Sequence, residues 1–158
     1  MTEHQKQFML EAIRLSYEGM SNNEGGPFGC VIVSNGKIVG TGNNKVTSTN
    51  DPTAHAEITA IRNACRELKT FQLNDCELYT SCEPCPMCLG AIYWARIKKV
   101  YFACSRYDAA SIGFDDDFIY TELKKGIIER SIPLEQILYN EALDVFKEWT
   151  NKADKIDY

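Results

Sequence analysis

The sequence lacks the features that would place it in a membrane or divide it into parts. No apolar run approaches the ~20 residues of a membrane-spanning helix. Residues 1–15 carry charged side chains, which argues against a secretory signal peptide, and the chain has no linker, low-complexity tract or internal repeat. We therefore expect a single domain, residues 1–158, with a sizeable core, because 44% of the residues are hydrophobic and 25% are charged.

Basic residues are too few for a typical nucleic-acid-binding surface. The chain has 17 Lys and Arg against 22 Asp and Glu, a formal net charge of −5. Its densest basic stretch is Arg96–Lys99, followed by Lys124-Lys125. Proteins that bind DNA or RNA normally carry a basic stripe. We therefore expect neither a nucleic acid nor a membrane as partner, and a small substrate with few phosphates.

Histidine is scarce, and the cysteines do not form a disulfide pattern. The chain has two histidines, His4 and His55, and seven cysteines, an odd number, most of them in apolar surroundings. Such cysteines are typical of reduced thiols, so we expect a cytoplasmic protein.

Two short motifs predict a catalytic metal site. His55-Ala56-Glu57 is followed by Pro84-Cys85-Pro86-Met87-Cys88. One imidazole and two thiolates make three protein ligands, and a catalytic zinc site leaves its fourth position to water. The pattern H-x-E…P-C-x-x-C is the signature of zinc nucleobase deaminases, in which the glutamate carries protons and is not a ligand. We expect one Zn²⁺ per subunit held by His55, Cys85 and Cys88, with Glu57 as the catalytic residue.

The spacing within the two motifs supports this assignment. Cys85 and Cys88 are three residues apart and share a face if they lie on a helix, whose first turn the neighbouring prolines suit. Asp51-Pro52-Thr53 predicts the start of a second helix. His55 and Glu57 are two residues apart, so they cannot both be ligands from the middle of a helix.

Two other metal sites remain open. The run Cys82-x-x-Cys85-x-x-Cys88 is compatible with an iron–sulfur cluster, although no fourth cysteine follows at short range. A structural zinc site usually has four protein ligands, and His4, the one spare imidazole, is far away in the sequence. Catalytic zinc is therefore favoured.

The hydrophobic pattern predicts a mixed α/β fold. Leu10, Ile13, Tyr17 and Met20 form an apolar stripe on a first helix. Asn35-Gly36 predicts a type I′ hairpin between two strands. We expect a three-layer α/β/α architecture with a mixed five-stranded sheet. The expected strands are residues 28–33, 37–42, 77–81, 99–104 and, as strand or extended chain, 132–138. The expected later helices run from His55 to about Leu68, from Cys85 through Trp94, over 107–112 and 118–125, and from a cap at Asn140.

Several segments together resemble bacterial guanine deaminases of the cytidine deaminase fold, over nearly the whole chain. They are residues 26–29, Asn43-Asn44, 50–57, 79–96 and 113–120. The resemblance implies a cytidine deaminase-like fold and the hydrolysis of guanine, a purine base, to xanthine and ammonia. It also implies a homodimer in which the C-terminal segment, about 140–158, is swapped onto the partner.

The resemblance also implies substrate contacts. Phe28 and Trp94 would pack the base, Asn44 and Asp116 would read its polar edge, Ala56 would touch it and Tyr158 would cap it. Each has a plainer interpretation. Phe28 and Trp94 could be ordinary core, Asn44 could cap a turn, Asp115 competes with Asp116, and Tyr158 could be a frayed terminus.

The metal motif does not specify the substrate, because cytidine, deoxycytidylate and tRNA adenosine deaminases share it. The alternatives are therefore guanosine or another nucleoside, a cytosine derivative, or tRNA adenosine. A non-catalytic zinc-binding scaffold is a further alternative, against which Glu57 argues, since structure alone does not need that carboxylate. The segment around Asp115-Asp116 and Tyr158 favours guanine.

Overall fold

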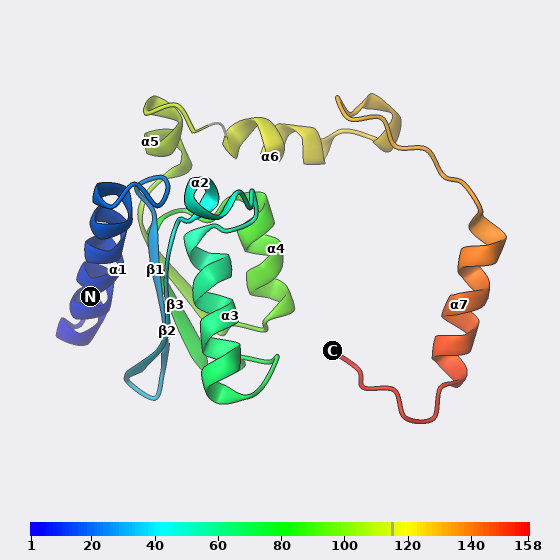
Figure 1. Ribbon diagram of the computed structural model, residues 1–158, viewed down its shortest axis with the longest axis horizontal. Helices are drawn as coiled ribbons and strands as arrows, with labels where there is room; N and C mark the ends of the chain where they lie inside the picture. Colours follow the sequence, from blue (N-terminus) through cyan, green and yellow to red (C-terminus); the bar gives the residue numbers. More distant parts are fainter. Residues whose placement is uncertain (115) are drawn as a thin grey trace. The chain divides into compact units, whose positions relative to one another are not determined.

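A four-stranded mixed sheet organises the first part of the chain in the computed structural model, which describes residues 1–114 and 116–158 (Figure 1). The strand order is β2-β1-β3-β4. β1 is antiparallel to β2 and β3, whereas β3 and β4 are parallel, so the predicted mixed sheet is confirmed. The strands are β1(Gly29–Ser34), β2(Lys37–Asn43), β3(Cys76–Cys82) and β4(Lys99–Cys104).

The predicted fifth strand is absent from the described residues. Residues 133–138 have no regular structure. Pro133 lacks the N–H that a ladder needs, and the apolar residues around it do not alternate with polar ones. The prediction of five strands was therefore wrong by one.

The hairpin between β1 and β2 has the predicted turn. Asn35 and Gly36 both have positive φ, 49° and 74°, as a type I′ turn requires. Ser34 pairs with Lys37 across it. Local sequence therefore sets the register in which the two strands begin.

Helices cover both faces of the sheet, which gives the expected three layers (Figure 1). α1(Glu3–Ser21) packs on one face, against Val31, Val33 and Tyr79. α3(Ala56–Leu68) and α4(Pro86–Trp94) pack on the other, over the main core. α3 lies very close to β2, because a Cβ on Gly42 would come 2.3 Å from the backbone oxygen of Ala56. This glycine lets the start of α3 lie directly on the sheet.

The predicted apolar stripe of α1 does not face the core. Leu10, Ile13, Tyr17 and Met20 are exposed, whereas the buried residues of the helix are Ala12, Ser16 and Gly19. Small side chains allow the helix to approach the sheet closely. The predicted helix is confirmed, and the face that it buries is the one with small side chains, not the apolar stripe.

The helix that follows His55 begins later than predicted. His55 is its N-cap and Ala56 its first residue. The Asp51 carboxylate accepts hydrogen bonds from the Thr53 backbone N–H, at 2.8 Å, and the Thr53 hydroxyl, at 2.7 Å. Asp51 therefore stabilises a turn before the helix. A short helix, α2(Val46–Thr49), also interrupts the loop expected between β2 and His55.

The chain divides into two compact units, Met1–Asp117 and Phe118–Tyr158. The first ends with α5(Arg106–Ser111) and the start of α6(Asp116–Lys124). The second holds the rest of α6, a 3₁₀ turn η1(Ile127–Glu129) and α7(Tyr139–Asn151). The N-cap of α7 is Leu138, not the predicted Asn140, and its backbone there is left-handed.

The second unit buries none of its described residues. Large apolar side chains along it are exposed, among them Ile128, Ile137, Phe146 and Tyr158. A segment of this length would normally bury such side chains against a core. Nowhere in the described chain is a helix both long enough and apolar enough to cross a bilayer.

Candidate active site and metal centre

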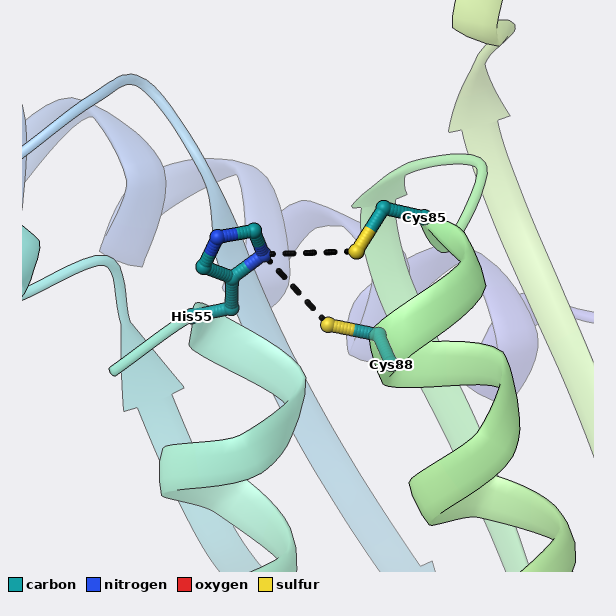
Figure 2. A group of neighbouring side chains, drawn as sticks. All are labelled: His55, Cys85 and Cys88. Carbon is teal, nitrogen blue, oxygen red and sulfur yellow. Dashed lines mark hydrogen bonds between the residues drawn. The ribbon is translucent and has the colours of Figure 1, made fainter. Parts of the chain in front are cut away.

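Three predicted ligands meet where α3 and α4 begin (Figure 2). The Nδ1 atom of His55 lies 3.5 Å from the sulfur of Cys85 and 3.5 Å from the sulfur of Cys88. All three ligand atoms lie within 4.8 Å of one another. Tetrahedral ligands about 2.0–2.3 Å from a zinc ion are about 3.5 Å apart. The donor set and its spacing therefore fit one Zn²⁺.

Local sequence explains why these side chains converge. Cys85 is the N-cap of α4 and Pro86 is its first residue, so Cys88 follows in the first turn. His55, the N-cap of α3, points toward both cysteines (Figure 2). Two neighbouring helix starts thus supply all three ligands.

Neighbouring side chains shift the pKa values of the three ligands in different directions. Hydrogen bonding to Cys88 and the nearby His55 lower the pKa of Cys85 to about 4, despite its burial. The same hydrogen bond to Cys85, together with burial, raises the pKa of Cys88. Hydrogen bonding to Cys85 raises the pKa of His55. Cys85 is therefore a thiolate at neutral pH, the form in which a cysteine binds a metal.

Glu57 lies in the first turn of α3 and is only 6% exposed. Its carboxylate Oε1 accepts a hydrogen bond of 3.1 Å from the Thr80 hydroxyl of β3. Burial raises the pKa of Glu57. A carboxylate with a raised pKa holds a proton more readily than an ordinary glutamate, which suits a group that must take up and return one.

A cavity of about 360 Å³ opens beside this cluster. This volume is at the small end of ligand pockets, which suits a small molecule. The cavity also brings together predicted site residues that are far apart in the sequence. Its walls include Phe28, Asn44, His55, Glu57, Cys85 and Asp116.

One wall of the cavity is a pair of aromatic rings. Phe28 and Phe114 pack edge to face, with their ring centroids 4.8 Å apart. Gly26 lies against them, since a Cβ there would come 2.8 Å from Phe114 Cζ. Phe114 was missed in the sequence. The available signal was an aromatic residue directly after Gly113, in a turn otherwise rich in acids.

Asn44 lines the cavity with its amide held in one orientation. Its Oδ1 accepts hydrogen bonds from the backbone N–H groups of Gly26, at 3.3 Å, and Val46, at 3.1 Å. This network assigns Oδ1 to the backbone and leaves the Nδ2 group as the donor for a ligand. The turn-capping and ligand-reading interpretations of Asn44 are therefore compatible.

The other predicted contacts are placed differently. Ala56 is fully buried at the start of α3. Trp94 ends α4, at the opposite end from Cys85, and is 65% exposed. It is not among the residues that line this cavity in the described chain. Tyr158 belongs to the second unit, and Asp115 lies outside the described residues.

The sequence matches a zinc-binding deaminase family and individual deaminases of known activity. Residues 2–104 match the family described as the cytidine and deoxycytidylate deaminase zinc-binding region. The chain is 56% identical to guanine deaminase of Bacillus subtilis (strain 168) over 151 residues, which is 96% of this chain and 97% of that protein. It is 45% identical over 126 residues to a tRNA-specific adenosine deaminase of Buchnera aphidicola, covering 79% and 83% of the two chains.

A solved structure shows the same arrangement. The X-ray structure of guanine deaminase from Bacillus subtilis superposes with a TM-score of 0.95 at 54% sequence identity, covering 100% of this chain and 99% of that one. This match confirms the predicted cytidine deaminase-like fold, and the family confirms zinc as the cofactor. With its His55, Cys85 and Cys88 cluster inside the matched region, the chain belongs to the cytidine and deoxycytidylate deaminase zinc-binding family.

Proposed function

We propose that this chain hydrolyses guanine to xanthine and ammonia. The observation that carries the proposal is the similarity to guanine deaminase over 96% of the chain, well beyond residues 2–104 that the wider family shares. Phe114 and Asp116 lie outside that shared region and line the cavity. The zinc chemistry thus comes from the shared part, and we assign the preference for guanine over other bases mainly to Phe114 and Asp116, which follow it.

His55, Cys85 and Cys88 would hold the zinc ion, which, when bound, supplies a Lewis acid that activates water at neutral pH. Glu57 takes a proton as water attacks the guanine carbon that bears the amino group. It delivers this proton to the adjacent ring nitrogen. It then carries the proton of the newly added hydroxyl to the amino nitrogen, so the C–N bond breaks, ammonia departs and the carbonyl of xanthine forms. Thr80 holds the Glu57 carboxylate in place through its hydrogen bond.

Polar and apolar groups around the cavity would select the base. The Asp116 carboxylate would accept hydrogen bonds from the adjacent N1–H and 2-amino groups of guanine. Asn44 would donate from Nδ2 to an acceptor of the base, while Phe28 and Phe114 cover apolar surface. Adenine lacks the N1–H and would leave the carboxylate poorly paired, so we expect it to be rejected.

Deamination of tRNA adenosine is the second candidate, because of the 45% identity to a tRNA-specific adenosine deaminase. The net charge of −5 and the lack of a long basic stripe argue against it, since RNA binding depends on phosphate contacts. A non-catalytic zinc-binding scaffold is disfavoured by Glu57, because burying a carboxylate beside the metal site costs stability without serving the fold.

The proposal includes a homodimer in which residues of about 140–158 are swapped onto the partner. It is supported by residues 118–158, which bury none of their described side chains. Trp94, 65% exposed, and Tyr158, 68% exposed, are accessible to a neighbouring subunit. A reducing cytoplasm is the compartment that we propose, because none of the seven cysteines, all of them among the described residues, forms a disulfide.

Ammonia release tests the proposed function directly. The zinc-loaded protein would be given guanine, guanosine, adenine, cytidine and a tRNA anticodon stem-loop, each with a chelator-stripped control. We expect metal-dependent release from guanine alone. Release from the stem-loop, weakened by added salt, would move the substrate to tRNA, and no release from any of them would refute the deaminase proposal.

A further inference from the structure

Glu83 lies in the metal loop, residues 83–85, which leads from β3 to α4. It connects this loop to α5 and, through α5, to Phe114 in the aromatic wall of the cavity. It lies two residues before Cys85, just after the end of β3. Its backbone N–H donates to the carbonyl oxygen of Cys104 at 2.8 Å. Its side-chain Oε2 accepts from the backbone N–H of Arg106 at 3.1 Å. One residue thus holds both the end of β4 and the start of α5.

The position of α5 determines where Phe114 lies. The backbone N–H of Phe114 donates to the carbonyl oxygen of Ala109, in α5, at 3.1 Å. Gly113, with φ of 95°, turns the chain between them. A shift of α5 would therefore move Phe114 away from Phe28 and change the wall against which a base packs.

A second contact ties α5 to the acidic side of the cavity. The Nε atom of Arg106 lies 3.7 Å from the Asp117 carboxylate, directly after Asp116. Among the described residues, Phe114 is thus linked to α5 by its own backbone hydrogen bond, and Asp116 through its neighbour Asp117. Glu83 in turn holds Arg106, the first residue of α5. The proposed chemistry gives Glu83 no role, although this half-buried side chain also lines the cavity.

We propose that Glu83 is a positioning residue that sets the base-binding wall, Phe114 and Asp116, relative to the metal ligands. It acts through its hydrogen bond to Arg106 and not by contact with the reacting atoms. The part of the inference that concerns guanine rests on the proposed function, whereas the mechanical link between the metal loop and α5 does not.

Three variants of the zinc-loaded protein test this role. Glu83→Ala removes the acceptor for the Arg106 N–H, whereas Glu83→Gln keeps an oxygen that can accept the same bond. Glu77→Ala is the matched control, because Glu77 is a carboxylate of β3, the strand that Glu83 follows, and accepts a hydrogen bond of 2.8 Å from the Tyr79 hydroxyl. Zinc content, kcat and KM for guanine, and amide hydrogen exchange over residues 105–114 would be measured for each.

For Glu83→Ala we expect faster exchange over residues 105–114, retained zinc, and a KM for guanine raised about tenfold with kcat within about threefold of the parent value. Glu83→Gln should restore both exchange and KM close to the parent values. Glu77→Ala should leave exchange over 105–114 and the kinetics unchanged.

Other outcomes would overturn the proposal. Unchanged exchange in Glu83→Ala would show that the link does not hold α5. A kcat that falls as far in Glu83→Gln as in Glu83→Ala would make the carboxylate charge part of the chemistry. Loss of zinc from both variants would restrict Glu83 to the metal loop. If the parent protein does not deaminate guanine, the proposed function fails, but the exchange data still decide the link.

Discussion

Replacing Glu57 with glutamine separates the proton-transfer role from the fold. Glutamine has nearly the same shape, and its oxygen can still accept the hydrogen bond that Thr80 donates to Glu57 at 3.1 Å. The side chain is 6% exposed, so any residue that filled this space differently would disturb the packing. Glutamine keeps this shape but removes the negative charge and the ability to take up and release a proton.

Loss of general acid–base catalysis should lower kcat by about 10²- to 10⁴-fold, which corresponds to about 3–5 kcal/mol of activation free energy. Guanine turnover would be followed by ammonia release or by the ultraviolet absorbance change, and zinc content by elemental analysis. Since the cluster of His55, Cys85 and Cys88 is untouched, we expect one zinc ion per subunit in the variant.

The same variant predicts a change in how stability depends on pH. Burial raises the pKa of Glu57 in the folded chain. Above the unfolded-state pKa the folded protein therefore holds a proton that the unfolded chain releases, and stability falls as the pH rises through this interval. Chelator-treated Glu57→Gln should lack that fall in urea unfolding. Near-normal turnover in a zinc-containing Glu57→Gln variant would refute the proton-transfer role.

Three further predictions concern the rest of the site. Asp116→Asn should lower kcat/KM for guanine at least about tenfold with zinc content unchanged, because an amide cannot accept from both donors of the base; unchanged kinetics would remove Asp116 from base recognition. Gly26→Ala should raise KM, because the added Cβ would come 2.8 Å from Phe114 Cζ, and an unaltered KM would show that the ring adapts freely. Zinc affinity should fall with falling pH, because the raised pKa of Cys88 means that metal uptake releases a proton; competition with a chromogenic chelator on both sides of neutral pH would measure this, and a flat profile would contradict it.

The parts of the site that sequence predicted are those set by local spacing. Cys85 and Cys88 lie in one helical turn, and His55 and Glu57 flank the start of another, so few backbone conformations are compatible with one ion. The Asn35-Gly36 hairpin is similarly local, since both residues must take positive φ. These predictions needed no knowledge of tertiary packing.

The parts that sequence missed depend on long-range contacts. Periodicity predicted an apolar face on α1 but could not say which face the sheet would accept. Close approach selects the face with small side chains, since a Cβ on Gly29 would come 2.2 Å from the backbone oxygen of Ala12. Phe114 likewise became a wall of the cavity only through its contacts with Gly26 and Phe28, far away in the sequence.

Because its ligands lie at the starts of two helices, a bound metal would also stabilise the fold. α1 and α5 begin with hydroxyl residues, Thr2 and Ser105, whose side chains cap the helices. In the described chain the equivalent positions of α3 and α4 are His55 and Cys85, whose side chains make no such cap. One bound ion would cross-link the starts of α3 and α4, much as a disulfide cross-links two segments. Metal loss should therefore loosen both helix ends together, and thermal stability should report zinc occupancy even where no substrate is turned over.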